Sequence, residues 1–325
     1  MIELKVGVIG CGRHSESHFE EIKKDQRLHL SAIAEVDRER LEESTSIHKP
    51  EHSFSDYQDM LQKTELDLVY VLTNPGHLLP IVSACLEEDI NTSVEKSPGM
   101  NSTETQLMAD AEKRSKAKAI VSFNRRYYPE VLAVRQEIQK SGGAVHVAAT
   151  YNKPMADLSH MQFTPVVPDP VIADSIHHVD LLRWLAGSDM ESAANAVEVY
   201  SAVQDGIRPG AHRHNASVKF DTGTIGSMMS HYGVGYRIQR TEVHAEDLSF
   251  YIDLTTRDRR IEYYRDGEEI SDKLDLESVG GPEYNETRHF VDCILEDKIP
   301  WSNLGDSIQT MRLCESIRAG HKGPL

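Results

Sequence analysis

Short runs rich in apolar residues recur through the first 123 positions of the chain. These runs cover residues 5–9, 28–36, 66–73, 90–95 and 119–123. Helical stretches at 77–88 and 102–116 separate the last three runs. Runs of this length are typical of buried strands, and strands that alternate with helices predict a parallel sheet covered on both faces. Ligands of such sheets bind at the carboxyl ends of the strands.

Beyond residue 128 the pattern changes. The expected elements are a helix near 129–140, a strand near 145–151, a proline-rich link over 164–170, a helix near 174–185, alternating strands at 224–232 and 259–264, and closing helices near 284–296 and 303–318. Turn signals such as Asp221-Thr222-Gly223 indicate hairpins between strands. The alternation of apolar and polar residues predicts a sheet with one face covered and the other available for association.

Length and charge bound the class of protein. At 325 residues the chain can form two cores, because single cores stop growing at roughly 250 to 300 residues. Its formal net charge of −17 argues against nucleic acid or an anionic membrane as a partner. We see no targeting segment and no apolar run near the roughly 18 residues of a membrane span, so we expect a cytoplasmic protein.

The sequence offers no pattern typical of a metal site. Cysteines stand only at Cys11, Cys85, Cys293 and Cys314, without the CxxC spacing of zinc sites or a disulfide framework. His212 and His214 alternate on an expected strand, but zinc needs further ligands. We therefore predict reduced thiols and no metal.

The first strand runs directly into a Gly10-x-Gly12 turn and then into a helical stretch, the context in which such a motif indicates dinucleotide binding. Gly10 can adopt the backbone angles of a tight turn, and Gly12 lets a pyrophosphate approach the main chain. The following helix presents free N–H groups to that anion. We predict that Gly10, Gly12, Arg13 and His14 bind the cofactor, with Ser15 in place of the usual third glycine.

The second apolar run leads to Asp37, where a Rossmann fold places the carboxylate that binds the adenosine ribose. Its charge would repel a 2′-phosphate and so favours NAD over NADP. Arg38, however, could pair with that phosphate, so NADP stays open. The alternative is an ordinary surface aspartate at the start of a helix.

Polar residues follow the third, fourth and fifth apolar runs. They are Thr73, Asn74, His77, Glu95, Lys96 and Asn124. Because the carboxyl ends of parallel strands share one edge of a sheet, we expect these side chains to line the same cofactor cleft as the glycine turn.

These features and several later segments together carry a family resemblance. The segments are Val8-Ile9-Gly10-Cys11-Gly12, His18, Asp37, Thr73-Asn74-Pro75, Glu95-Lys96-Ser97-Pro98, Phe123-Asn124-Arg125-Arg126-Tyr127-Tyr128-Pro129 and His177-His178-Val179-Asp180-Leu181-Leu182-Arg183-Trp184-Leu185. In this order and spacing, nearly the whole chain resembles the glucose-fructose oxidoreductase / inositol dehydrogenase (Gfo/Idh/MocA) family.

The resemblance implies an α/β fold in two domains. Residues 1–123 would form an NAD(P)-binding Rossmann domain with a parallel sheet. Residues 124–325 would form a C-terminal α/β domain with a large open, mostly antiparallel sheet that binds substrate and joins copies into a homodimer or homotetramer. The last helices are expected either in this domain or packed back on the first. The usual substrates of the family are sugars, cyclitols and nucleotide sugars.

The resemblance also points to Lys96 and His177 as catalytic residues. Oxidation of a secondary alcohol by NAD needs a group that takes the hydroxyl proton, and the ordinary histidine pKa of about 6.5 suits His177 to this role. Lys96 would stabilise negative charge on the substrate oxygen or share the proton transfer. Ala173 stands where the family has an aspartate. Asp174, on the same helical face as His177, is the candidate replacement, or else a helix cap.

Substrate contacts are expected near the start of the second domain. Arg125, Arg126 and Tyr127, together with His177, could bind substrate hydroxyls or a phosphate. For one of the arginines a solvent-facing position is an equal alternative. Glu95 would orient Lys96 or contact the cofactor.

The leading hypothesis is an NAD(P)-dependent oxidoreductase that transfers a hydride between the nicotinamide and a secondary hydroxyl of a sugar, cyclitol or nucleotide sugar. Two alternatives remain. A non-catalytic NAD(P)-binding regulator is suggested by Ala173 and by Ser97, which replaces the usual proline. An enzyme that uses tightly bound NAD as a transient oxidant is the other.

Overall fold

The computed structural model describes residues 3–158, 165–206, 210–256 and 258–325. They divide into two compact units. Unit 1 comprises Met1–Ser122 and Glu286–Ser307, and unit 2 comprises Phe123–Asn285 and Ile308–Leu325. The proline-rich link expected over 164–170 begins outside the described residues.

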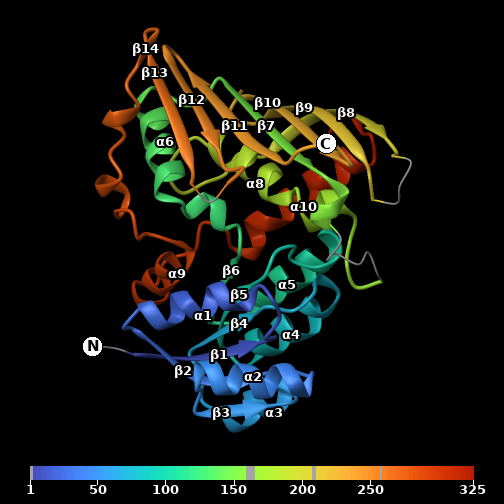
Figure 1. Cartoon of the computed structure of the whole chain (residues 1–325), viewed down its shortest axis with the longest axis vertical. Coiled ribbons are helices and arrows are strands. Elements are labelled where there is room, and N and C mark those ends of the chain that lie inside the picture. Colours follow the sequence, from blue (N-terminus) through green and yellow to red (C-terminus); the bar gives the residue numbers. More distant parts are fainter. Residues whose placement is uncertain (1–2, 159–164, 207–209, 257) are drawn as a thin grey trace. The chain divides into compact units, whose positions relative to one another are not determined.

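Unit 1 is built on a parallel sheet in which the described strands lie in the order β3-β2-β1-β4-β5-β6 (Figure 1). The strands are β1 (Leu4–Ile9), β2 (Leu28–Ala34), β3 (His52–Phe54), β4 (Leu68–Val71), β5 (Asn91–Val94) and β6 (Ala119–Val121). Residues of the central strands such as Val6, Val8 and Val69 are fully buried, as expected for a sheet covered on both faces. This order is that of the dinucleotide-binding doubly wound fold.

Helices cover both faces of this sheet. They are α1 (Ser15–Lys24), α2 (Arg38–His48), α3 (Tyr57–Lys63), α4 (Pro75–Glu87), α5 (Ser102–Arg114) and α9 (Glu286–Leu295). Although α9 comes late in the sequence, it lies beside α1 (Figure 1). Unit 1 therefore takes its last helix from a segment that follows most of unit 2.

Unit 2 is built on a mostly antiparallel sheet, whose described strands lie in the order β14-β13-β12-β11-β7-β10-β9-β8-β15. The strands are β7 (His146–Lys153), β8 (Ala196–Gln204), β9 (Arg213–Phe220), β10 (Ile225–Tyr232), β11 (Ile238–Ala245), β12 (Leu248–Asp253), β13 (Arg260–Arg265), β14 (Glu268–Glu269) and β15 (Lys322–Pro324). Strands β7 and β10 pair in parallel. With unit 1, this arrangement confirms the predicted fold class.

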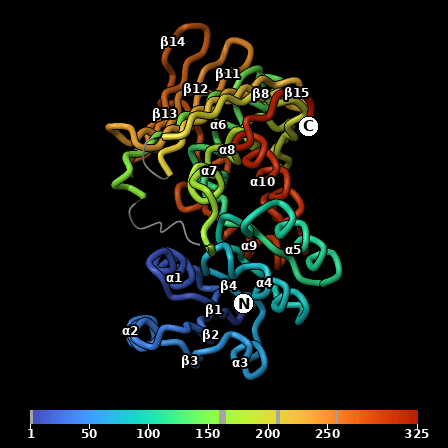
Figure 2. The backbone as a smooth tube through the Cα atoms, turned by 90° about the vertical axis from the view of Figure 1, so that its right-hand side faces the viewer, coloured from blue at the N-terminus to red at the C-terminus, as the bar shows by residue number. Residues whose placement is uncertain are grey.

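The helices of unit 2 gather on one face of its sheet (Figures 1 and 2). They are α6 (Pro129–Lys140), α7 (Pro170–Ala173), α8 (Ile176–Leu185) and α10 (Leu304–Arg318), whose first turn belongs to unit 1. Short 3₁₀ turns are η1 (Asn124–Tyr127), η2 (Met155–Leu158), η3 (Ser271–Lys273) and η4 (Glu277–Val279). Buried and exposed residues alternate along β9 and β10. Among the described residues, no helix covers the other face of the sheet.

Candidate functional site

The glycine turn joins β1 to α1. Gly10 has a φ of +93°, and a Cβ there would lie 3.0 Å from the carbonyl oxygen of Leu72. Its N–H donates to the Ala34 carbonyl over 2.9 Å. A Cβ on Gly12, by contrast, would meet nothing within 4 Å. The protein itself therefore requires glycine at position 10, whereas position 12 faces open space that a ligand can use.

The first turn of α1 continues this surface. The backbone N–H and hydroxyl of Ser15 both donate to the Gly12 carbonyl, over 3.0 Å and 2.6 Å. Arg13 and His14 are exposed just before the helix. Ser15 thus fixes the turn by hydrogen bonds where a third glycine would serve only for close packing.

The acidic residue at the end of β2 is Glu35, which sequence reasoning missed. Its buried carboxylate accepts the N–H groups of Cys11 and Asp37 over 2.8 Å and 2.9 Å, and pairs with Arg40 over 2.9 Å. Burial alone would raise the pKa of Glu35, but Arg40 and the two N–H groups lower it overall. Glu35 therefore lies as an anion directly beside the glycine turn. The signal was available, because Glu35 is an acid within the run of residues 28–36, two positions before Asp37.

Asp37 lies two residues further, in the N-cap of α2, and accepts the N–H of Arg40 over 3.0 Å. The neighbouring Arg38 is exposed and pairs with Glu42 on its own helix over 2.8 Å. The structure so brings two carboxylates, from Glu35 and Asp37, to the edge where an adenosine ribose would lie.

The ends of β4 and β5 carry the next predicted residues. Thr73 has its hydroxyl oxygen buried without a hydrogen-bond partner among the described residues. Asn74 and His77 are exposed at the start of α4. In a doubly wound fold the two halves of the sheet hold the two halves of a dinucleotide, so Thr73 and its neighbours belong to the nicotinamide half.

Glu95 and Lys96 follow β5. A Glu95 carboxylate oxygen lies 3.7 Å from Nε2 of His18 on α1, and both side chains are mostly buried. Burial would raise the pKa of Glu95, but His18 and Lys96 lower it overall. Burial likewise would lower the pKa of His18, and Glu95 raises it overall. Each of the two side chains therefore favours the charged form of the other, and Lys96 follows Glu95 in sequence.

In unit 2, Asp174 lies between α7 and α8 and is 6% exposed. Its carboxylate accepts hydrogen bonds from the Tyr151 hydroxyl at 2.9 Å, the Lys153 ammonium at 2.7 Å and the Tyr232 hydroxyl at 3.1 Å. Burial, with the Asp174 charge, raises the pKa values of Tyr151 and Tyr232 well above their ordinary range. The sequence did not single out these three donors. Through them Asp174 connects the segment between α7 and α8 to strands β7 and β10 in the interior of unit 2.

The two adjacent histidines of α8 differ in environment. His177 is partly exposed, whereas His178 is fully buried, with its Nδ1 3.2 Å from the Thr241 hydroxyl. Burial and the nearby Arg125 lower the pKa of His178 well below its ordinary value. Of the pair, His177 is therefore the one that can meet a ligand.

The predicted site residues in η1 also differ from one another in exposure and in hydrogen-bond partners. Asn124 is exposed, and Arg125 donates to the Gln239 side chain over 2.8 Å while lying 5.3 Å from the Tyr151 ring. Arg126 is fully buried, and its guanidinium binds both carboxylate oxygens of Asp180. This geometry argues against the expectation that Arg126 binds substrate, since Asp180 occupies its donors. Tyr127 is likewise fully buried.

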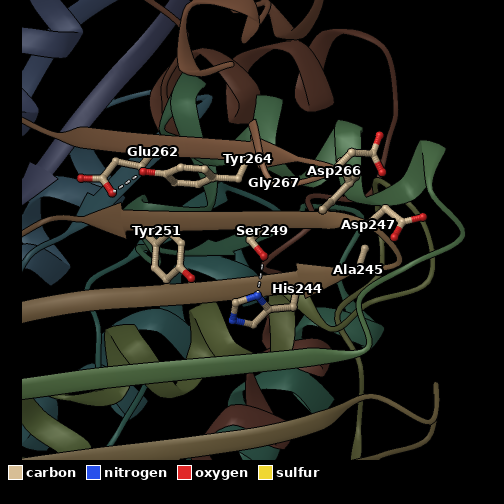
Figure 3. Close-up of a pocket in the computed structure, with 10 residues that line it drawn as sticks. His244, Ala245, Asp247, Ser249, Tyr251, Glu262, Tyr264, Asp266 and Gly267 are labelled. Atoms are coloured by element: carbon tan, nitrogen blue, oxygen red, sulfur yellow. Dashed lines mark hydrogen bonds between the residues drawn. The ribbon is translucent and has the colours of Figure 1, made fainter. Parts of the chain in front are cut away.

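A depression of about 790 Å³ lies on the exposed face of the unit 2 sheet, along β11 to β13 (Figure 3). Its lining includes His244, Tyr251, Glu262 and Tyr264. The rings of Tyr251 and Tyr264 meet edge to face, and the His244 ring lies 2.9 Å from the Ser249 hydroxyl. None of the predicted site residues lines this depression.

The predicted cofactor residues of unit 1 therefore lie along one sheet edge, while Asn124, Asp174, His177 and the two arginines belong to unit 2. Among the residues that the structure describes, no group of three His, Cys, Asp or Glu side chains could hold a metal ion. Within the same ranges, no helix is long and apolar enough to cross a membrane.

The strand order, the glycine turn and the acid after β2 define unit 1 as a dinucleotide-binding domain. Residues 4–123 match the model of an oxidoreductase family with an NAD-binding Rossmann fold. This match supports the predicted family and an NAD cofactor for unit 1.

Two curated relatives and one solved structure illustrate the similarity. A myo-inositol 2-dehydrogenase of Thermotoga maritima is 22% identical over 241 residues, covering 73% of this chain and 72% of the relative. An inositol 2-dehydrogenase of Paracoccus denitrificans is 26% identical over 201 residues, covering 58% and 56%. The chain thus spans little more than half the length of the second relative. A levoglucosan dehydrogenase solved with NADH shares the fold, with a TM-score of 0.84 at 18% identity over 98% of this chain and 96% of that one.

Proposed function

We propose that the protein is an NAD-dependent dehydrogenase that oxidises a secondary hydroxyl of a sugar, cyclitol or nucleotide sugar. The observation that carries the proposal is the unit 1 edge: an open Gly12, two carboxylates at the ribose position and a buried, unpartnered Thr73 hydroxyl. Each suits a different part of NAD. The inositol and levoglucosan dehydrogenases among the relatives support the class of substrate.

The residues fit the cofactor in the following way. The turn at Gly10 and Gly12 would hold the pyrophosphate, with the N-terminus of α1 adding its dipole. Glu35 and Asp37 would bind the ribose hydroxyls and disfavour a 2′-phosphate, so NAD is preferred over NADP. Thr73 would donate to the nicotinamide half. NAD, when bound, supplies the hydride acceptor.

The chain's own groups supply proton transfer and charge. Lys96, at the nicotinamide half of the cleft, is proposed to stabilise negative charge that develops on the substrate oxygen. His177 is proposed to take the proton from the hydroxyl in oxidation and to return it in reduction. The carboxylate of Asp174 is already bound by Tyr151, Lys153 and Tyr232. Asp174 is therefore proposed to fix the backbone at the start of α8, the helix that carries His177.

A screen of sugars, cyclitols and nucleotide sugars for NADH absorbance tests this function, with NADP in parallel. Lys96→Ala and His177→Ala should each lower turnover at least roughly a hundredfold, in the range measured for general acid–base groups. Arg240→Ala, at an exposed position of β11 to which the proposal gives no role, serves as a control and should leave turnover unchanged. If NAD binds and no substrate in the screen reduces it, the dehydrogenase proposal is wrong.

One observation favours a second candidate, a non-catalytic NAD-binding sensor. The family aspartate is replaced by Ala173, and the carboxylate of Asp174 is taken up by three interior donors. A sensor would keep its biological effect in Lys96→Ala and His177→Ala and lose it in Gly12→Asp. An enzyme with tightly held NAD would instead convert substrate without net NADH release.

Self-association through the open sheet face is the proposed assembly, as a homodimer or homotetramer. Tyr200, Ile225 and Met229 are 53%, 52% and 38% exposed on that face. Clustered exposed apolar residues mark protein interaction sites. Met229→Glu should shift the sedimentation coefficient toward the monomer, while the control Glu43→Gln, at an exposed position of α2 in unit 1, should not. A monomeric parent protein at high concentration would refute this assembly.

A further inference from the structure

A buried group of titratable side chains lies beneath the nicotinamide half of unit 1. It consists of His18 on α1, Glu95 after β5 and Glu286 at the start of α9, and we name it the acid–histidine cluster. The dehydrogenase chemistry proposed above does not use His18 or Glu286. Both are nevertheless well shielded from water, with Glu286 only 7% exposed.

Glu286 is the least satisfied member of the cluster. One carboxyl oxygen accepts the Ser122 hydroxyl over 2.7 Å, and the other is buried without a hydrogen-bond partner among the described residues. A buried carboxylate with half its oxygens unpaired is costly, whereas the neutral acid is much less so. Burial raises the pKa of Glu286 to about 7, with Glu95 adding to the rise and His18 and Ser122 opposing it.

The other groups around the cluster are few. His18 interacts with Glu95, Glu286 and, on its own helix, Glu21, and its ring lies 5.7 Å from that of Tyr70. The Tyr70 hydroxyl lies 3.4 Å from the hydroxyl of Thr287, the residue next to Glu286. Burial raises the pKa of Tyr70 well above its ordinary value, so Tyr70 stays neutral near pH 7.

Glu95 meets His18, Lys96 and, more weakly, His14. With His18 protonated, Glu95 ionised and Glu286 protonated, the cluster is neutral. Loss of one proton from Glu286 leaves it with a net negative charge beside Lys96.

We propose that Glu286 and His18 are positioning residues that hold the Glu95 carboxylate and, through it, Lys96, and that the single exchangeable proton of the cluster sets the balance between the oxidised and reduced cofactor. The inference rests on the proposed function, since it requires that NAD binds along this edge. The oxidised nicotinamide carries a positive charge and the reduced one does not. A negative cluster therefore favours NAD⁺, and a neutral cluster favours NADH.

Equilibrium binding of NAD⁺ and of NADH to the full chain, from about pH 6 to about pH 8, tests the inference. For the parent protein the ratio of the NADH Kd to the NAD⁺ Kd should rise with pH by at least about fivefold, the lower range of a coupling between two sites. Glu286→Gln keeps the shape and stays neutral, so its ratio should change less with pH than that of the parent. Glu112→Gln is the matched control, because Glu112 is a partly buried acid of unit 1 whose pKa burial likewise raises to about 7. It should behave as the parent.

A second variant covers the case in which Glu286→Gln does not fold. Ser122→Ala removes the hydrogen bond that lowers the pKa of Glu286, so the pH at which the ratio changes should move upward. The same variants should shift the pH profile of kcat, an effect that a merely structural role for Glu286 would not produce. An unchanged pH dependence in Glu286→Gln, or a parent ratio that does not vary with pH, overturns the inference.

Failure of the proposed function would look different. In that case neither NAD⁺ nor NADH would bind at any pH, and the balance proposed here would fall with it. Infrared titration of the cofactor-free protein would still report on the proton, as a carboxylic acid band that Glu286→Gln removes. The presence of that band without cofactor binding would assign the failure to the proposed function.

Discussion

Replacing each of the two glycines of the β1–α1 turn by alanine should show which glycine the stability of the fold requires and which one cofactor binding requires. Gly10 has a φ of +93°, and an added Cβ would lie 3.0 Å from the Leu72 carbonyl oxygen. A non-glycine residue held in this conformation costs about 1–3 kcal/mol. Gly10→Ala should therefore destabilise the cofactor-free protein by at least this amount.

Gly12→Ala should behave in the opposite way. Its Cβ would meet nothing within 4 Å, so the cofactor-free protein should change by no more than about 0.5 kcal/mol. The methyl group would, however, occupy the space through which a pyrophosphate reaches the backbone N–H groups. The loss of one hydrogen bond to a charged group costs roughly 1.5–3 kcal/mol, which weakens binding about 10- to 100-fold.

Thermal unfolding without cofactor and NADH titration by fluorescence measure the two effects. The expected pattern is a lower Tm for Gly10→Ala alone and a raised Kd for both variants. A Gly12→Ala protein that binds NADH as tightly as the parent would show that the pyrophosphate does not lie on this turn. A large fall in its Tm would show that the open space is filled by the protein itself.

Three further results are expected. Arg126→Met should cost about 3–5 kcal/mol in urea unfolding, because it leaves the Asp180 carboxylate buried and unpaired, and addition of Asp180→Leu should restore most of that loss. His289 is buried, which lowers its pKa from 6.5 to about 3. Its side chain therefore stays neutral in the folded protein, whereas the same side chain in the unfolded protein takes up a proton below about pH 6.5. Stability should thus fall as pH falls from about 6.5 toward 3, and His289→Gln should lose less between about pH 7 and pH 5 than the parent; equal losses would contradict this assignment. Glu35→Gln should raise the NADH Kd roughly tenfold, and more than Asp37→Asn does, if Glu35 is the principal ribose ligand; the reverse order would favour Asp37.

Most strands of unit 1 could be predicted because they are buried on both faces, which leaves short runs rich in apolar residues in the sequence. Strand β3 (His52–Phe54) was not predicted, because two of its residues are exposed and no such run marks it. The same rule misplaced the end of β2. Val36 prolongs the apolar run, yet it is 85% exposed, since the chain turns after Ala34. That shift of two residues drew attention to Asp37 and away from Glu35.

The unit 2 residues show why side-chain roles were harder to predict. Arg125 and Arg126 are adjacent and chemically identical, and only the fold reveals that Asp180 binds the second. Asp174 was expected to serve His177 from its place in the sequence. Its observed partners come from β7 and β10, which are distant from it in the sequence. No local sequence pattern predicts such contacts.

The return of α9 to unit 1 has a consequence for how the protein is made. A nascent chain that has emerged as far as Ser122 contains every strand of the unit 1 sheet, but the hydroxyl of Ser122 has no Glu286 to bind until more than half of the remaining chain has left the ribosome. Domains generally fold as units, in order of synthesis. Here the first unit to be started is completed almost last, so a finished unit 1 arises only together with the unit 2 sheet and never as a separate early product.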